Sequence, residues 1–167
     1  MKMLVTGASS FVGAHFCSLA ARRRMDVIGL WRSTPLALAG VRSLQGDASL
    51  ISPPPGLDVV VHLAAKVMAD DAPAQNRRMM DNILSWGKPV IYGSSTVVHW
   101  PRQNAYARSR IEDEERLRKS GLPYLIVRPC APYGPWHPEH SPTHRESMQT
   151  LAAMVTHLPV VPLIGSG

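Results

Sequence analysis

A short run of small residues near the N-terminus has the composition of an anion site. Residues 7–10 (Gly-Ala-Ser-Ser) follow the apolar run 3–6, and an amphipathic segment starts at Phe11. This order predicts a strand, a tight turn and a helix, and a helix N-terminus favours phosphate through its free N–H groups and its dipole. Gly7 would let the chain leave the strand sharply, and Gly13 would let the helix lie close to the sheet. We therefore predict a phosphate site here, with a strand–turn–helix that binds nothing as the alternative.

Two further features bear on a dinucleotide. Ser10 stands where the dinucleotide fingerprint has its middle glycine, which crowds the backbone but leaves a hydroxyl that can donate to phosphate. Arg32 and Ser33 directly follow the apolar run 26–31. In dinucleotide-binding folds an acid at this point selects NAD, whereas an arginine accommodates the extra phosphate of NADP. The sequence favours NADP, with NAD as the second choice; a solvated arginine without a ligand is the alternative interpretation.

Strand and helix patterns alternate along the chain. The predicted strands are 3–6, 26–31, 41–47, 58–65, 88–93 and 122–127, and the predicted helices are 11–24, 72–86, 106–119 and 145–157. Residues 48–57 contain three consecutive prolines, so this connection should be a loop with at most one turn. In the helix 72–86 we expect Asn76 on the polar side. The alternation predicts an α/β fold, a doubly wound parallel sheet between two helical layers.

Composition limits the function classes. The 167 residues suit one domain, and no run is long enough to span a membrane or to form a signal peptide, so we expect a cytoplasmic protein. The net charge of +6 is scattered apart from the run Arg22–Arg24, which argues against nucleic-acid binding but suits a phosphorylated substrate. Cys17 and Cys130 have neither metal-binding nor redox spacing and are expected to be plain thiols.

A proline-rich loop is expected over residues 128–142. It contains His137, Glu139 and His140, and His144 follows shortly after. These side chains could bind zinc, but the prolines oppose the helical geometry that would bring them together. We expect a loop over the ligand cleft and no metal site.

Together these segments resemble the NAD-dependent epimerase/dehydratase group of the extended short-chain dehydrogenase/reductase superfamily. The matching segments occur in the family's order: Thr6–Gly13, Gly46-Asp47, His62–Ala65, Asn76 with Asn82, Ser94–Thr96, Tyr106–Arg110, Arg128-Pro129 and Tyr133–Pro135. The resemblance implies a single Rossmann-fold domain over residues 1–167.

The resemblance also implies catalytic residues. Tyr106 would be the acid/base, and Ser95 would hydrogen-bond the reacting oxygen of the substrate. Arg110 stands where the family has a lysine; it carries the same charge but cannot pass a proton on. The implied cofactor-binding residues are Gly7, Ser9, Ser10, Phe11, Val12, Gly13, Arg32, Ser33, Asp47, Leu63, Ala64, Ala65, Tyr106 and Arg110.

Two functions follow from this resemblance. The first is an NAD(P)-dependent oxidoreductase, epimerase or dehydratase acting on a hydroxyl or keto group of a small molecule such as a nucleotide sugar. The second is a nucleotide-binding pseudoenzyme with a regulatory or assembly role. In the family, the segment resembling Pro162–Gly167 leads into a C-terminal substrate region, and none follows here. The chain is thus expected to be a fragment, or a natural truncation whose substrate site is open or completed by a homodimer or another protein.

Overall fold

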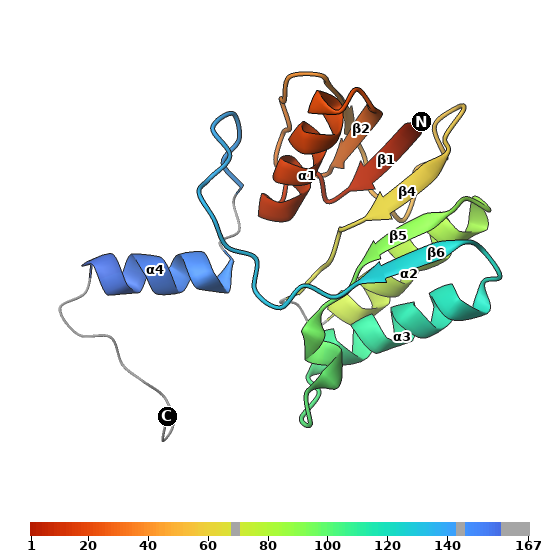
Figure 1. Ribbon diagram of the computed structural model, residues 1–167. Coiled ribbons are helices and arrows are strands. Elements are labelled where there is room, and N and C mark those ends of the chain that lie inside the picture. The colour runs from red at the N-terminus through yellow and green to blue at the C-terminus, as the bar shows by residue number, and fades with distance from the viewer. Residues whose placement is uncertain (68–70, 143–145, 158–167) are drawn as a thin grey trace.

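The computed structural model describes residues 1–67, 71–142 and 146–157, and it contains a six-stranded parallel sheet of order β3-β2-β1-β4-β5-β6 (Figure 1). The chain starts in the middle of the sheet, builds one half outward, and returns to build the other half, which confirms the doubly wound Rossmann-type fold. The strands are β1 (Lys2–Thr6), β2 (Asp26–Trp31), β3 (Val41–Gln45), β4 (Val59–His62), β5 (Val90–Gly93) and β6 (Tyr124–Val127).

Helices cover both faces of the sheet. The helix α1 (Phe11–Arg22) packs on one face, where Ala14 and Cys17 join a buried cluster with Val5 and Val61. The helices α2 (Ala72–Ser85) and α3 (Ala105–Lys119) lie together on the opposite face, beneath β5 and β6 (Figure 1). The helix α4 (Ser147–His157) stands apart from the other elements (Figure 1). Helices therefore flank the sheet on both faces, and within residues 1–67, 71–142 and 146–157 the layer formed by α1 covers only part of its face.

The central strands are apolar because both of their faces are covered. All four residues of β4 are buried, whereas the edge strands β3 and β6 are mostly exposed. The connection from β3 to β4 contains no helix; the N–H groups of Leu50 and Ile51 donate to the carbonyl of Asp47 in one turn, and the N–H of Leu57 donates to the carbonyl of Pro54 in another. This confirms the predicted loop, since three prolines cannot continue a helix.

Some predicted boundaries were wrong. The helix α1 ends at Arg22 rather than at residue 24, and Arg24 adopts a left-handed conformation with a φ of 60°. The strand β4 ends at His62 rather than at residue 65. Of the C-terminal predictions, His144, Arg145 and residues 158–167 lie outside the described residues.

The placement of Asn76 on the polar side of α2 was also wrong. Its side chain is 1% exposed; it accepts from the N–H of Lys66 and donates to the carbonyl of Lys66 and to the hydroxyl of Ser109. Asn76 thus fixes the segment after β4 against α2 and α3. Among the described residues, no helix has both the length and the apolar character needed to cross a bilayer.

Candidate active site

The glycine-rich turn lies at the point where the direction of strand addition reverses, since β1 has β2 on one side and β4 on the other. Gly7 has a φ of +67°, and a Cβ there would lie 2.7 Å from the backbone nitrogen of Ala64. A Cβ on Gly13 would collide with the carbonyl oxygen of Gly7 and would lie 2.8 Å from the Cα of Ala8. Both positions therefore need glycine, one for conformation and close approach, the other for close approach alone.

The turn presents free backbone donors. Ser10 caps α1, its hydroxyl oxygen accepting from the N–H of Gly13 at 3.0 Å. The N–H groups of Phe11 and Val12 have no hydrogen-bond partner among the described residues. Ser9 lies at the same turn, where its carbonyl accepts from His140 Nε2 at 2.9 Å. Two unpaired amides at the positive end of a twelve-residue helix are suited to an anion.

The segment after β4 forms the opposite side of this turn. The N–H of Ala64 donates to Thr6 Oγ1 at 3.2 Å, so the segment is fixed to the end of β1. Leu63 and Ala64 are partly buried and Ala65 is exposed. Ala64 and Ala65 carry only methyl groups, so their side chains add little bulk next to the ends of β1 and β4.

Arg32 and Asp47, two of the predicted cofactor-binding residues, also lie together. Arg32, just after β2, pairs with Asp47, just after β3, through Nη1 and Oδ2 at 3.3 Å. Asp47 also accepts from the N–H and the hydroxyl of Ser49, at 2.9 and 2.7 Å. Ser49 foremost, followed by Arg32, holds the pKa of Asp47 below its usual value despite partial burial. Ser33 follows Arg32 and is exposed.

Ser95 and Tyr106 lie after β5 on neighbouring elements. Ser95 directly precedes the 3₁₀ turn η1 (Thr96–His99), and its hydroxyl oxygen accepts from the N–H of Val97 at 3.4 Å. Tyr106 is in the first turn of α3, which is capped by Asn104, and η1 packs against α3. Since Ser95 accepts this bond, its own proton stays free to be donated to a ligand.

The side chain of Arg110 is buried in the interior. It is 0% exposed, and its Nη2 donates to Asp113 Oδ2 at 3.1 Å. The guanidinium carbon lies 5.3 Å from the ring centroid of Tyr92 and 5.3 Å from that of Tyr106. The charge is thus next to the Tyr106 ring, while its hydrogen bond goes to Asp113. A role of Arg110 at the cofactor stays a prediction.

A chain of buried polar groups extends from Arg110 to β1. The hydroxyl of Tyr92 donates to Asp113 at 2.9 Å, the ring of Tyr92 stacks on His62, and His62 Nδ1 lies 2.7 Å from Thr6 Oγ1. Burial, and secondarily Arg110, lowers the pKa of His62 to about 3, so the ring is neutral. Burial is also the main reason why the pKa values of Asp113 and Tyr92 are raised. His62 Nε2 and Arg110 Nε and Nη1 have no partner among the described residues, so His62 is only half satisfied.

Glu114 joins three elements next to Ser95. Its carboxylate accepts from the Ser94 hydroxyl at 2.6 Å, from Arg128 Nε and Nη2 at 2.7 and 2.6 Å, and from Arg118 at 2.6 Å. Burial alone would raise the pKa of Glu114, but these donors, Arg128 foremost, lower it to about 2. The ends of β5 and β6 are thereby fixed to α3, which holds Ser95 relative to Tyr106. Sequence reasoning missed Glu114 because residues 112–115 are all acidic and look like a solvated surface.

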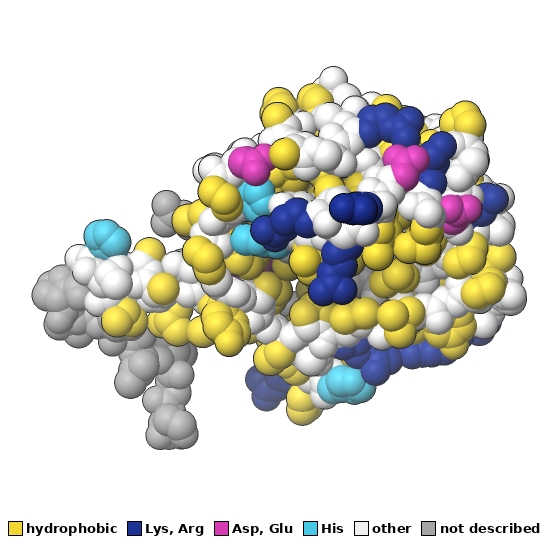
Figure 2. Space-filling view, turned by 45° about the horizontal axis from the view of Figure 1, so that its top comes forward, with side chains coloured by type: hydrophobic (Ala, Val, Ile, Leu, Met, Phe, Trp, Pro, Cys, Tyr) yellow, Lys and Arg dark blue, Asp and Glu magenta, His cyan; other side chains and the backbone are white. Residues whose placement is uncertain are grey.

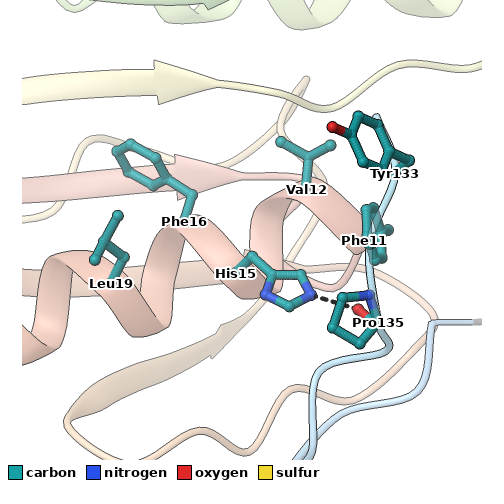
Figure 3. A pocket seen from close by; sticks show the side chains of 8 residues that line it. Phe11, Val12, His15, Phe16, Leu19, Tyr133 and Pro135 are labelled. Atoms are coloured by element: carbon teal, nitrogen blue, oxygen red, sulfur yellow. Dashed lines mark hydrogen bonds between the residues drawn. The ribbon is translucent and has the colours of Figure 1, made fainter. Parts of the chain in front are cut away.

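The loop after β6 folds back on the first turn of α1. His15 Nε2 lies 3.1 Å from the carbonyl oxygen of Pro135, and the ring of Trp136 meets that of Phe11 edge-on. A groove of about 490 Å³ lies between this loop and α1 (Figure 3). It is lined by Phe11, Val12, His15, Phe16, Leu19, Tyr133, Gly134 and Pro135. His137 and His140 are buried in the loop, and no cluster of metal ligands occurs in the part of the chain that the structure describes.

The sequence of residues 3–87, about half of the chain, matches the NAD dependent epimerase/dehydratase family. The chain belongs to this family. It is 28% identical to the ceramide reductase of Caulobacter vibrioides over 173 aligned positions, which cover 94% of this chain and 53% of that protein. This member of the family thus spans about half the length of that relative.

Solved structures with low sequence identity share the fold. A UDP-galactose 4-epimerase superposes with a TM-score of 0.67 at 22% identity, covering 84% of this chain and 59% of that one. The UDP-glucose 4-epimerase of Bifidobacterium longum, in complex with NAD+ and UDP, superposes with a TM-score of 0.65 at 16% identity. That alignment covers 77% of this chain and 52% of the epimerase. The chain therefore has the Rossmann-type fold of these enzymes.

Proposed function

We propose that this chain is the dinucleotide-binding part of an NAD(P)-dependent oxidoreductase, epimerase or reductase acting on a hydroxyl or keto group. One observation supports the proposal: the glycine-rich turn follows β1 and Ser95 follows β5 at the same end of the parallel sheet, and Tyr106 lies in the first turn of α3, against which η1 packs. Ligands of open α/β sheets bind at this edge. A nucleotide sugar is the proposed substrate class, supported by solved structures of similar fold in complex with UDP and with UDP-glucose.

The residues at the turn fit a dinucleotide. The unpaired N–H groups of Phe11 and Val12 can donate to a diphosphate, and Ser10 can add a hydroxyl. Gly7 and Gly13 let the backbone of the turn pack closely, because a Cβ at either position would lie too near to backbone atoms. Ala64 and Ala65 lie after β4, on the opposite side of this turn. When bound, the nicotinamide supplies hydride chemistry, and the chain supplies binding, orientation and proton transfer.

Ser95 and Tyr106 are assigned to the substrate oxygen. Hydride transfer at a carbinol carbon requires a proton to move at its oxygen in the same step. Tyr106 would accept or donate that proton through its phenolic oxygen, while the free hydroxyl proton of Ser95 would be donated to the same oxygen. The guanidinium carbon of Arg110 lies 5.3 Å from the centroid of the Tyr106 ring, so a positively charged side chain stands beside this tyrosine.

NADP is the proposed cofactor, because Arg32 follows β2 without an acidic residue in its place. In the structure Arg32 pairs with Asp47, so a 2′-phosphate would share the guanidinium with this carboxylate or displace it. Arg32 is half exposed, which leaves its other nitrogens open to a ligand.

A second candidate is a nucleotide-binding pseudoenzyme. It is favoured by Arg110, whose guanidinium is fully buried and bonded to Asp113. This candidate predicts dinucleotide binding without turnover.

Tyr106→Phe and Ser95→Ala separate the two candidates. We expect Tyr106→Phe to abolish turnover and Ser95→Ala to lower it by 10²-fold or more, as loss of a general acid/base or of a transition-state donor does. Neither change should alter dinucleotide affinity more than a few-fold. The assay follows NADPH or NADH absorbance with a panel of nucleotide sugars and simple ketones. Tyr124→Phe, an exposed tyrosine on β6, is the matched control.

If wild-type protein binds a dinucleotide but shows no turnover, the enzyme proposal is wrong and the pseudoenzyme proposal stands. Arg110→Met is unsuited to this test, because it would leave the buried carboxylate of Asp113 without its partner. Arg110→Lys keeps the charge, and the enzyme proposal expects it to retain or raise activity.

A further inference from the structure

Part of the loop after β6 is fastened across the start of α1, and we call this part, residues 133–140, the strap. His15 Nε2, on α1, lies 3.1 Å from the carbonyl oxygen of Pro135 (Figure 3). His140 Nε2 lies 2.9 Å from the carbonyl oxygen of Ser9, in the turn before α1. The strap is therefore held at two points by histidine side chains.

The strap brings three histidines close together. The rings of His15 and His137 meet edge-on, with their centroids 5.2 Å apart. The N–H of His140 donates to the carbonyl of His137 at 3.2 Å, and these two strap histidines are only 8% and 6% exposed. In the space-filling view, histidine side chains lie next to basic side chains on this part of the surface (Figure 2). A positive charge gained here would be poorly hydrated and close to other cations.

The three histidines bond in different directions. A carbonyl oxygen only accepts, so His15 and His140 must donate from Nε2. His137 does the reverse, because its Nδ1 lies 3.2 Å from the backbone nitrogen of Glu139, whose N–H can only donate. Protonation leaves the bonds of His15 and His140 in place, since Nε2 donates in both states. It destroys the bond of His137, because Nδ1 then carries a proton and cannot accept.

The bond accepted by His137 shapes the turn from which the outer contacts of the strap extend. It closes onto Glu139, whose carboxylate accepts from the N–H of Ala39 at 3.0 Å, in the connection between β2 and β3. The next residue, His140, makes the bond to Ser9. A proton on Nδ1 would face the N–H of Glu139, so this turn would have to open and both contacts would lose their support.

A cation at His137 has little to balance it. The titratable and charged groups that act on this ring are His15 and Arg22 on α1, and Glu139 and His140 in the strap. Only Glu139 favours a positive charge there. Burial foremost, followed by His15, holds the pKa of His137 below its ordinary value despite Glu139. The docked strap therefore prefers the neutral ring.

We propose that the strap is a pH-sensitive device, docked on α1 and the preceding turn while His137 is neutral and released when His137 takes up a proton. A released His137 has the ordinary histidine pKa of about 6.5. Because the pKa is lower in the docked strap, docking has its full advantage above about pH 6.5 and loses it as pH falls below that value. Glu114 and His62, with pKa values of about 2 and about 3, titrate at lower pH.

The fluorescence of Trp136 reports the position of the strap without any cofactor or substrate, so the test does not depend on the proposed function. The Trp136 ring meets that of Phe11 edge-on at 6.0 Å and is 40% exposed. Its signal is the difference between wild-type protein and Trp136→Phe. Between about pH 7.5 and about pH 5, we expect its emission to shift to the red. Its quenching constant with acrylamide should rise roughly twofold, as the side chain goes from 40% to full exposure.

His137→Asn removes the titration but keeps the acceptor. An asparagine side-chain oxygen can accept from the N–H two residues on and takes up no proton in this range. We expect Trp136 in this variant to stay docked at both pH values. His99→Asn is the matched control, because His99 is an exposed histidine in η1, and it should respond as wild type does.

The proposal is overturned if Trp136 in wild-type protein keeps its accessibility over this range, a result that needs no folded His137→Asn variant. It is equally overturned if His137→Asn keeps the wild-type response. Far-UV circular dichroism should stay constant, since release is local. A loss of that signal over the same range would show unfolding of the domain in place of release of the strap, and would also contradict the proposal.

Discussion

Arg110 is a predicted site residue whose side chain is fully buried. By the resemblance it replaces a lysine, and its guanidinium lies near the rings of Tyr92 and Tyr106 and bonds to Asp113. Asp113 has a raised pKa, chiefly through burial, so the ion pair forms at a cost in desolvation. The sequence identified the replacement, but not the direction of the side chain. That direction depends on Asp113, which lies three residues later and could be placed only by the packing of α3 on β5.

At the same scale, Arg32 is predicted to select NADP. Arg32→Asp would face Asp47 and the 2′-phosphate with like charge, and should cost about 1.5–3 kcal/mol, or roughly ten- to hundredfold in NADPH affinity. Fluorescence titration with NADPH and NADH measures the preference. Arg42→Asp is the control, because Arg42 is also an exposed, ion-paired arginine, but its partner is Asp26 at the start of β2, whereas Arg32 follows the end of β2. If wild-type protein binds NADH as tightly as NADPH, Arg32 does not select the cofactor.

At the scale of elements, the alternation of apolar runs and helical periods was sufficient to predict the order of strands and helices. It was least accurate at their ends, as at β4, where the apolar run continues through Ala65 but pairing stops at His62. Asn76 was placed on the wrong side because a buried asparagine bonded to a backbone segment has no periodic signal. Glu114 was missed for a related reason. Its partners lie on β5 and β6, and only the fold brings them to α3.

The hydrogen bonds of Glu114 with Ser94, Arg118 and Arg128, here called the Glu114 clamp, should make the free energy of unfolding depend on pH. Its folded pKa of about 2 lies below the ordinary 4.5, so its contribution is fully present above pH 4.5 and is lost as pH falls toward 2. From about pH 6 to about pH 3 this group should cost about 2 kcal/mol of unfolding free energy. Urea denaturation at both pH values should show this loss in wild type and a smaller loss in Glu114→Gln.

His62 contributes in the same direction, since its folded pKa of about 3 is also lowered, so the comparison must be between variants. Glu115→Gln is the matched control, because Glu115 is exposed and only loosely paired with Lys119 at 4.0 Å. A loss of stability in Glu114→Gln as large as in wild type would show that the clamp does not titrate as described.

At the scale of the whole molecule, the chain spans about half the length of the relatives that it matches, and the described residues of this span form a parallel sheet. The strand–turn–helix at the N-terminus was predicted from residues 3–13 alone, because a strand, two glycines and a helix start are local features, and phosphate binding there stays a prediction. Ser95, Tyr106 and this turn are far apart in the sequence and are related only by the order of the strands. From the sequence, this grouping could be predicted only through the family resemblance. The exposure of Leu125 and Val127 on β6 could not have been predicted. Their sequence is apolar, as it would be in a strand that is buried on both faces.

The central claim is that the edge formed by the ends of β1 and β4 binds a dinucleotide, and isothermal titration calorimetry of the full chain tests it most directly. We expect saturable binding of NADPH, weaker binding of NADH, and loss of both in Gly13→Val, whose side chain would strike the backbone of Gly7. Circular dichroism would confirm that the variant remains folded. Folded wild-type protein that binds neither dinucleotide, or folded Gly13→Val that binds them as tightly as wild type, would contradict the account.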